Sequence, residues 1–186
     1  MRDAALWSVT VVGCGGTGGH VAEGLCRLLP PRCKIVLVDP DRVEQRNLVR
    51  QNFLQGELGQ FKSEALALRL ARQYQRTVGY SVYPIGYVDS LLALDAMGLV
   101  IGCVDNGPAR RDIGSFGNYG RHSWWVDAGN GDHYGQVLIG SLGAMGATGA
   151  YNTFDAAKQK CQYLPSPIAQ RPELLAELPQ AASCAA

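Results

Sequence analysis

A run of glycines near the start of the chain constrains its fold more than any other feature. In VTVVGCGGTGGH, Gly13, Gly15 and Gly18 have the spacing G-x-G-x-x-G, and Gly16 lies between them. A β-branched segment precedes the glycines and a helical pattern follows, which is the context of a phosphate-binding loop. The first glycine allows a tight turn, the second lets a phosphate approach the backbone, and the third lets the helix pack closely. The alternative is a glycine-rich turn without a ligand, and the loop alone does not distinguish NAD, FAD and ATP.

Predicted strands and helices alternate along the first two-thirds of the chain. The pattern predicts strands at 7–13, 34–39, 80–85, 97–105, 122–129 and 135–141, and helices at 17–29, 64–75 and 108–120. Val21, Leu25 and Leu28 share one predicted helix face, and Ser63 is expected to cap the second helix. This alternation predicts an α/β fold with a Rossmann-like, doubly wound, mainly parallel sheet and helices on both faces.

The last part of the chain lacks this alternation. Glycines recur every third residue from Gly140 to Gly149, and a proline-punctuated segment follows. This composition predicts a mobile loop or chain crossover, with one short helix at most, near Glu173 to Leu178. We therefore expect a nucleotide-binding Rossmann-like domain at residues 1–140. Residues 141–186 are expected to form a flexible crossover and tail, which is an incomplete C-terminal part.

The composition excludes several functional classes. The chain has 186 residues, of which 47% are apolar and 18% charged, and this indicates an ordinary globular domain. A net charge of +1 without a separate basic cluster argues against nucleic acid as a partner. No apolar run approaches the roughly 20 residues of a membrane span, and no signal peptide is recognisable. Six cysteines without a C-x-x-C pair favour a reduced, cytoplasmic setting.

Acids, arginines and amides follow the second predicted strand, in LVDPDRVEQRNLVRQ. Asp39 ends that strand, and an acid at this distance from the glycine loop takes the ribose hydroxyls of a nucleotide. A plain strand-end acid is the alternative for Asp39, and a solvated position is the interpretation for Arg46. A dehydrogenase pattern would stop at Asp39, whereas this chain continues with further charged and amide side chains.

Four segments, GCGGTG, DPDRVEQRNLVRQ, GQFK and CVDN, occur in this order along the chain. Together they resemble the ThiF/MoeB and ubiquitin-activating enzyme superfamily over about residues 8–140. The segment WWVDAGN…GQVLIG is similar to ThiF-like proteins of PRTRC-type mobile-element systems. The resemblance implies an adenylyltransferase that uses ATP and Mg2+ and acts on the C-terminal glycine of a ubiquitin-like or sulfur-carrier protein. It also implies a homodimer.

The resemblance assigns roles to the residues after the second strand. Asp39 would hold the ribose, and Asp41 would brace the loop and the metal side. Asn47 would touch the ribose or the phosphate region. Arg50 and Gln51 would face the phosphates, and Arg50 would stabilise the charge of the triphosphate.

The resemblance assigns further roles downstream. Lys62 would neutralise the phosphates, Asp105 would hold Mg2+ with Asn106 beside it, and Arg110 would be a structural or phosphate-side partner. The chemistry agrees, because adenylation brings two anions together and needs cations, a metal-holding acid and backbone donors. Arg50, Lys62 and Asp105 are therefore the expected catalytic residues. Lys62 taken alone would more often be a surface residue, so the assignment rests on the joint spacing.

Three departures from the family pattern stand out. Only about seven residues precede the first strand, so the arginine that many members supply to the partner's ATP is missing or replaced by Arg2. Cys161 and Cys184 are too few thiolates for a four-ligand zinc site, so no zinc is expected. Third, members that form thioesters or persulfides use a cysteine in the crossover or C-terminal region, whereas here Cys184 lies near the end of the chain and Cys161 has only lysines as activating neighbours. Whether either cysteine forms a covalent intermediate is left open by the sequence.

Two alternatives compete with adenylation. A non-catalytic nucleotide-binding module of the same fold would bind ATP without pyrophosphate exchange. An NAD-dependent oxidoreductase would prefer NADH, but Lys62 and the segments NLVRQ and CVDN would then have no role.

Overall fold

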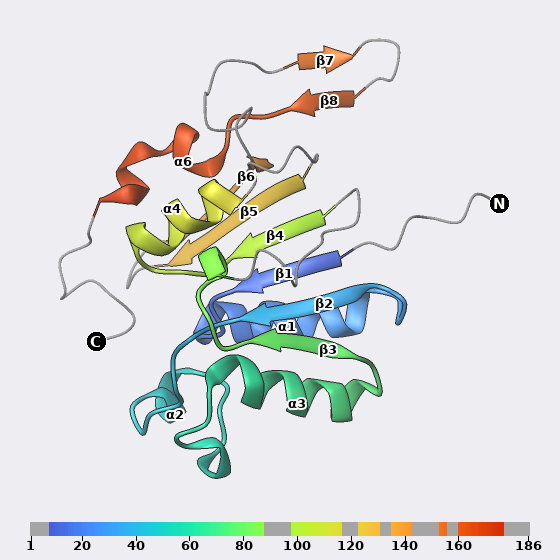
Figure 1. The fold of residues 1–186 in the computed structure, drawn as a ribbon, viewed down its shortest axis with the longest axis vertical. Helices are drawn as coiled ribbons and strands as arrows, with labels where there is room; N and C mark the ends of the chain where they lie inside the picture. The colour runs from blue at the N-terminus through green and yellow to red at the C-terminus, as the bar shows by residue number, and fades with distance from the viewer. Residues whose placement is uncertain are drawn as a thin grey trace.

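The computed structural model describes residues 8–87, 98–116, 123–130, 135–142, 153–155 and 160–176. Six strands form one sheet in the order β3-β2-β1-β4-β5-β6 (Figure 1). They are β1 (Ser8–Val12), β2 (Lys34–Val38), β3 (Val78–Ser81), β4 (Gly98–Gly102), β5 (Ser123–Asn130) and β6 (Gly135–Leu142). Strands β1 to β5 pair in parallel, and β6 pairs antiparallel with β5. The predicted α/β, Rossmann-like, mainly parallel sheet is therefore confirmed.

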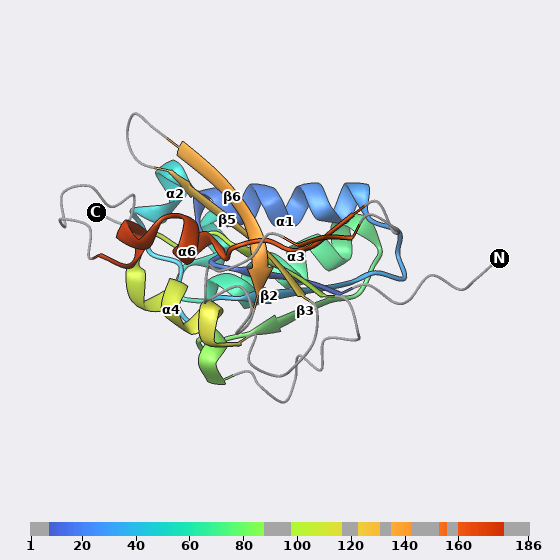
Figure 2. The ribbon, with the colours of Figure 1, turned by 90° about the horizontal axis from the view of Figure 1, so that it is seen from above.

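Helices cover both faces of this sheet (Figure 2). The helical segments are α1 (Gly16–Leu28), α2 (Asn47–Arg50), η1 (Gln55–Glu57), α3 (Lys62–Tyr74), η2 (Ile85–Tyr87), α4 (Gly107–Phe116), α6 (Pro167–Gln170) and η4 (Pro172–Leu175). Two short strands, β7 (Thr153–Asp155) and β8 (Lys160–Tyr163), form a separate hairpin. Within the described residues, every helix is too short or too polar to span a membrane.

Alternate residues of the central strands point to opposite faces of the sheet and contribute to a hydrophobic core on each face. Val11 and Leu37 pack with Leu66 and Leu70 of α3 on the face that α1 also covers. Val12, Val38 and other side chains on the opposite face pack with residues of α4 and with Trp125, which is fully buried. A parallel sheet covered on both faces needs strands that are apolar on both sides, and all five residues of β1 are buried.

Arg76 stabilises the end of the sheet that lies opposite the glycine loop. It is buried, and its guanidinium donates hydrogen bonds to the carbonyl oxygens of Cys26, Leu29, Pro30 and Cys33. Two of these carbonyls belong to the last turn of α1 and the residue after it, where backbone acceptors lack intrahelical donors. Arg76 therefore closes the C-terminal end of α1 and the turn that leads to β2.

Two sequence predictions about helices are wrong. Ser63 is not the cap of α3, because the helix begins at Lys62 and its cap residue is Phe61. The Ser63 side chain is instead fully buried, and its hydroxyl lies 2.9 Å from the Asp39 carbonyl oxygen and 2.8 Å from that of Ser81. Leu28 does not share the buried face of α1, since it lies near the helix end and is 83% exposed.

The third strand is shorter and earlier than predicted. It ends at Ser81, because the residues of β2 that pair with it, from Ile35 to Val38, run out there. Pro84 then precedes the short helix η2, although the sequence suggested a strand through this proline.

The described C-terminal residues pack against the main sheet. The Ser141 N–H donates to the Leu164 carbonyl oxygen at 3.1 Å, and Gln170 Nε2 donates to the Ile139 carbonyl oxygen at 2.8 Å. Two short helical segments, α6 and η4, stand where one was expected. Most of the glycine repeat from Gly140 to Gly149 lies outside the described residues, and the division at residue 140 stays a prediction.

Candidate functional site

A cavity of about 740 Å³ opens at the carboxyl edge of the sheet. It spans the point between β1 and β4, where the strand order reverses and where ligands bind in open α/β sheets. Its walls come from the ends of β1, β2, β4 and β5, from the start of α1 and from residues 171–176. Distant parts of the chain therefore meet in one site.

The glycine loop forms the floor of this cavity. Gly13 has φ +89°, and a Cβ atom there would lie 2.6 Å from the Cys103 carbonyl oxygen. A Cβ on Gly18 would overlap the Gly13 carbonyl oxygen, so this glycine lets α1 start directly against the loop. Gly15 and Gly16 line the cavity itself. Gly13 thus allows the tight turn, Gly15 and Gly16 leave the backbone open to the cavity, and Gly18 allows the close packing of the helix.

Asp39 braces this loop. Its Oδ2 accepts the Cys14 N–H at 2.6 Å and its Oδ1 accepts the Asp41 N–H at 2.9 Å. Burial raises the pKa of Asp39, whereas the two N–H donors and the charge of Lys62 lower it. Asp39 therefore braces the loop, and the role expected for Asp41 stays a prediction.

Asp41 and Lys62 pair at the cavity wall. Lys62 Nζ lies 3.0 Å from Asp41 Oδ2, and the Lys62 N–H donates to the Asp41 carbonyl oxygen at 2.8 Å. The Lys62 side chain is 10% exposed, whereas that of Asp41 is 68% exposed. The cation is thus held inside the cavity by a carboxylate that remains open to solvent.

The helix α2 brings Arg50 and Gln51 to the cavity but keeps Asn47 out of it. Gln51 Oε1 is buried and has no hydrogen-bond partner among the residues that the structure describes. Asn47 is buried and its Oδ1 accepts the Glu44 N–H at 2.8 Å beside a smaller cavity of about 140 Å³. Arg46 pairs with Glu44 at 2.6 Å and both side chains are more than half exposed, which confirms the solvated interpretation of Arg46.

Asp105 and Asn106 lie in the turn between β4 and α4, on the cavity wall. Asn106 Oδ1 accepts the Ala109 N–H at 2.9 Å and so caps α4, while its Nδ2 lies 3.3 Å from Asp105 Oδ1. The described residues contain no cluster of three or more His, Cys, Asp or Glu side chains suited to a metal. A single carboxylate nevertheless fits Mg2+, which is usually held by one or two carboxylates together with substrate phosphates.

The sequence reasoning missed a buried acid behind the cavity and the residues of β5 on the far wall. Asp127 on β5 is fully buried and pairs with Arg110 at 3.2 Å. Thr17 at the start of α1 donates to Asn130 Oδ1 at 2.8 Å, which links the glycine loop to the end of β5. An acid inside the apolar segment WWVDAGN was the available signal, because an acid near the carboxyl end of a strand falls at the ligand edge.

The thiols at the site are protonated. Burial raises the pKa of Cys103 to about 12, and burial with the charge of Asp39 raises the pKa of Cys14 well above its usual value. Neither thiol has the low pKa of a nucleophilic cysteine. The side chain of Cys161 and all of Cys184 lie outside the described residues, so their roles and the expected absence of zinc stay predictions.

The chain was compared with protein families, curated proteins and solved structures. Residues 2–180 match the model of the ThiF family. The chain belongs to the ThiF family. Ubiquitin-like modifier-activating enzyme 5 of Drosophila grimshawi is 31% identical over 141 residues, which cover 67% of this chain and 33% of that protein. The enzyme of the same name from Bombyx mori is 33% identical over 133 residues, which cover 63% of this chain and 33% of that protein.

Among solved structures, E. coli MccB with MccA-N7isoASN matches with a TM-score of 0.60 and 20% identity. The match covers 80% of this chain and 44% of that chain, and it supports the ThiF-type fold alone. The chain thus spans about a third of the length of the curated relatives that it matches.

Proposed function

We propose that this ThiF-family chain is an enzyme that binds ATP with Mg2+ and adenylates the C-terminal glycine of a ubiquitin-like or sulfur-carrier protein. The observation that carries the proposal is the convergence of opposite charges at one edge of the sheet. Lys62 and Arg50 line the same cavity as the glycine loop and Asp105. Its relatives are named as ubiquitin-like modifier-activating enzymes, which supports this class of substrate.

The nucleotide would lie across the ends of β2, β1 and β4. Its ribose would meet Asp39 and Asp41 at the end of β2, and its phosphates would lie over Gly15 and Gly16 at the start of α1. Helix N-termini with free N–H groups favour phosphate charge. Asn47 would act indirectly, because it is buried and bonds the Glu44 N–H beside the smaller cavity.

The cations would face the phosphates. Lys62 would exchange its carboxylate partner for a phosphate oxygen, and Arg50 would neutralise the triphosphate. The unpartnered Oε1 of Gln51 requires a hydrogen-bond donor, which a water or a ligand hydroxyl would supply. These groups would stabilise negative charge that grows during transfer.

The reaction would be an attack on the α-phosphorus by the carrier's terminal carboxylate. A carboxylate oxygen–phosphorus bond forms and the bond to the leaving pyrophosphate breaks, so the adenylate and pyrophosphate are the two products. Asp105, with Asn106 beside it, would hold Mg2+, and a bound magnesium ion would screen the phosphate charges. The chain's own groups would orient the reactants and exclude water.

The remaining parts of the proposal concern assembly and setting. A homodimer and a cytoplasmic location are expected from the resemblance and from cysteine usage. Arg2, the candidate for the trans arginine, lies outside the described residues. Nucleic acid is not an expected partner at a net charge of +1. These points stay predictions.

Pyrophosphate exchange with candidate carriers that end in Gly-Gly tests the activity. We expect ATP-dependent exchange in the intact chain and its loss in Lys62→Ala and Asp105→Ala, with the fold retained. Failure of the intact chain to bind ATP contradicts the proposal. ATP binding without exchange would instead support a non-catalytic nucleotide-binding module, and a preference for NADH in calorimetry would support an oxidoreductase.

A further inference from the structure

A buried ion pair lies directly behind the turn that carries Asp105. Arg110 on α4 is 4% exposed and Asp127 on β5 is fully buried. Arg110 Nε lies 3.2 Å from Asp127 Oδ1 and 3.3 Å from Oδ2. The same guanidinium donates through Nη2 to the Val104 carbonyl oxygen at 2.7 Å. Arg110 therefore connects a carboxylate on β5 to the residue before Asp105.

The turn at residues 103–106, here called the Asp105 turn, is anchored at three points. Its start is held by the Cys103 N–H, which donates to the Val12 carbonyl oxygen at 2.7 Å. Its end is held by Asn106, whose side chain caps α4. Arg110 holds the middle at the Val104 carbonyl, on the N-terminal side of Asp105, whereas Asn106 Nδ2 lies 3.3 Å from Asp105 Oδ1 on the other side. Losing the Arg110 hydrogen bond frees the peptide that sets the direction of the Asp105 side chain.

The backbone around the pair is shaped to admit it. A Cβ on Gly129 would lie 3.1 Å from Arg110 Nη2, and a Cβ on Gly102 would lie 3.3 Å from Asp127 Oδ1. Both contacts are tight, so these glycines give the guanidinium and the carboxylate their room. Arg110 also lines the cavity, so its planar group is both a wall of the site and a support of the turn.

Stability alone is a weak reason for such a pair. Removing two charges from water offsets most of their mutual attraction, and apolar side chains of similar size often hold a fold equally well. An apolar pair, however, cannot donate a hydrogen bond to the Val104 carbonyl oxygen. The contribution that an apolar pair would not make is therefore the fixed position of the Val104 peptide within the turn.

We propose that Arg110 and Asp127 form a positioning pair that orients Asp105 toward the metal and phosphate part of the cavity. The identity of that ligand rests on the proposed function, whereas the anchoring of the turn does not. Neither residue needs to touch the reacting atoms. Asp127 acts through Arg110, and Arg110 acts through the Val104 carbonyl.

The double variant Arg110→Met with Asp127→Leu tests this, because it replaces the pair with apolar side chains. We expect amide hydrogen exchange at residues 103–106 to accelerate about tenfold or more while the melting temperature stays near that of the unmodified chain. By calorimetry, the tightening of ATP binding caused by Mg2+, taken relative to ATP binding without Mg2+ in the same variant, should fall about 10–100-fold, the usual effect of losing a partner that orients a metal ligand.

Two further variants separate positioning from general stability. Asp127→Asn keeps the side-chain shape and weakens the pair, so it should give smaller changes in the same direction if the double variant fails to fold. Arg76→Met alters the other buried arginine that donates to backbone carbonyls, at the far end of the sheet. It should lower the melting temperature without changing the exchange at 103–106 or the Mg2+ dependence.

Unchanged exchange at residues 103–106 in the double variant and in Asp127→Asn overturns the positioning proposal, whatever the chain binds. Accelerated exchange with an unaltered Mg2+ dependence overturns it as well, because the turn would then not serve the metal. An unmodified chain that binds ATP with Mg2+ but shows no pyrophosphate exchange contradicts adenylation alone. Hydrogen exchange at residues 103–106 still tests the positioning role of Arg110 and Asp127 in that case.

Discussion

Lys62 lies inside the cavity with a carboxylate already beside it. Its Nζ is 3.0 Å from Asp41 Oδ2, so the charge that would meet a phosphate is held in place before any ligand arrives. The Asp41 side chain is largely exposed, and removing its partner leaves a carboxylate that water can solvate. A substitution at Lys62 should therefore affect ligand binding far more than folding.

Lys62→Met should weaken ATP binding about 10–100-fold, the loss expected for one hydrogen bond to a charged group. The free energy of unfolding should change by no more than about 1 kcal/mol, since the Asp41 carboxylate is 68% exposed and water screens the pair. Calorimetry with ATP and with adenosine checks this, because adenosine carries no phosphates and should bind equally to both chains. Lys34→Met, the same change on the opposite edge of the sheet, is the control. An equal loss of adenosine binding would contradict the assignment of Lys62 to the phosphates.

Cys103 lines the cavity, yet its thiol should be unreactive. With the pKa of Cys103 raised to about 12, only about one thiol in ten thousand is ionised at pH 8, and the thiolate is the reactive form. Mass spectrometry after brief iodoacetamide treatment at pH 8 should find Cys103 unmodified in the folded chain and modified in urea. Reactivity should rise only as the pH approaches 12. Fast labelling of the folded chain would contradict the burial of this thiol.

At the scale of elements, α1 depends on two neighbouring glycines with opposite surroundings. A Cβ on Gly18 would overlap the Gly13 carbonyl oxygen, whereas a Cβ on Gly19 would meet no atom within 4 Å. The first position joins the helix to the loop, and the second is an ordinary helix position. The same substitution should therefore have opposite effects at adjacent residues.

Gly18→Ala should destabilise the fold by about 2–3 kcal/mol, because the added methyl group pushes the helix away from the loop. Gly19→Ala should stabilise it by about 0.5–1 kcal/mol, since alanine is the better helix former. Urea unfolding of both variants measures the difference. Equal effects of the two substitutions would show that the helix start is not locked to the loop.

Much of the element pattern could be predicted from the sequence. The apolar runs of β1 and β2 and the glycine spacing carry local signals that lead directly to a strand, loop and helix. The predictions are wrong where residues outside the segment determine a side-chain contact or the end of a strand. Ser63 is drawn to the carbonyls of Asp39 and Ser81 rather than to its own helix end, and β3 stops where β2 stops pairing. No local pattern contains that information.

For the site, the sequence predicted the residues next to recognisable motifs and missed those that arrive from elsewhere. Asp127 lies in the quoted segment WWVDAGN, but no role was assigned to it, and its partner Arg110 was expected only to be a structural or phosphate-side residue. Arg171 and Glu173 come to the cavity because the chain returns over β6 and α4. Such a return depends on packing between distant segments, which neither periodicity nor spacing encodes.

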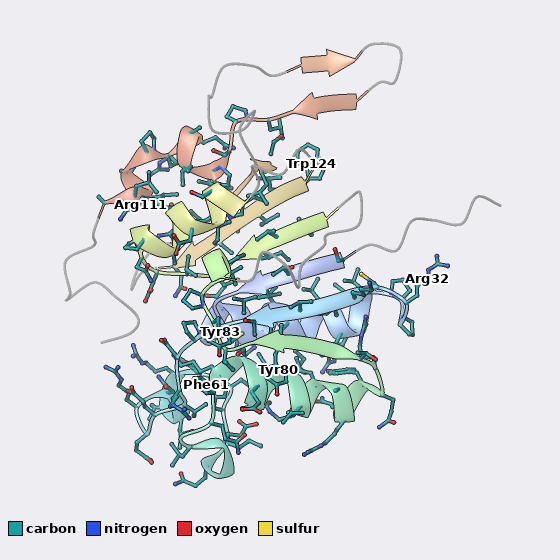
Figure 3. All side chains as sticks on the ribbon, in the orientation of Figure 1. Arg32, Phe61, Tyr80, Tyr83, Arg111 and Trp124 are labelled. Atoms are coloured by element: carbon teal, nitrogen blue, oxygen red, sulfur yellow. The ribbon has the colours of Figure 1, made fainter. Side chains whose placement is uncertain are left out.

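At the scale of the whole molecule, one wall of the cavity is formed by residues 171–176, which pack against α4 from more than 50 residues further along the chain. Arg111 Nη1 donates to the Leu175 carbonyl oxygen at 3.1 Å, and Figure 3 shows Arg111 on α4 beside this segment. A Cβ on Gly107, the first residue of α4, would overlap the same Leu175 carbonyl group. The contact between η4 and α4 is therefore sensitive to a single methyl group.

Gly107→Ala should release residues 171–176 from α4. Cleavage after the exposed Glu173 by a glutamate-specific protease should accelerate several-fold, because proteases act on locally opened chain. ATP affinity should change by less than about threefold, since the glycine loop and Lys62 are untouched. Gly24→Ala, at a position with no atom within 4 Å, is the control and should leave the cleavage rate unchanged. Unaltered cleavage in Gly107→Ala would mean that the segment is held by other contacts.

The hydrogen bonds from Arg76 to four backbone carbonyls have a consequence for folding during synthesis. They join residues 43 to 50 positions apart, all within the portion that runs from α1 to β3. We expect this portion to assemble as a unit while the chain is being synthesised, before β4 has emerged. Until then one edge of β1 has no strand to pair with, and such an edge attracts other chains. We therefore expect the nascent chain to be most prone to aggregation after Arg76 has been synthesised and before β4 has paired with β1. The cavity needs β4 as well, so it is expected to form after that interval.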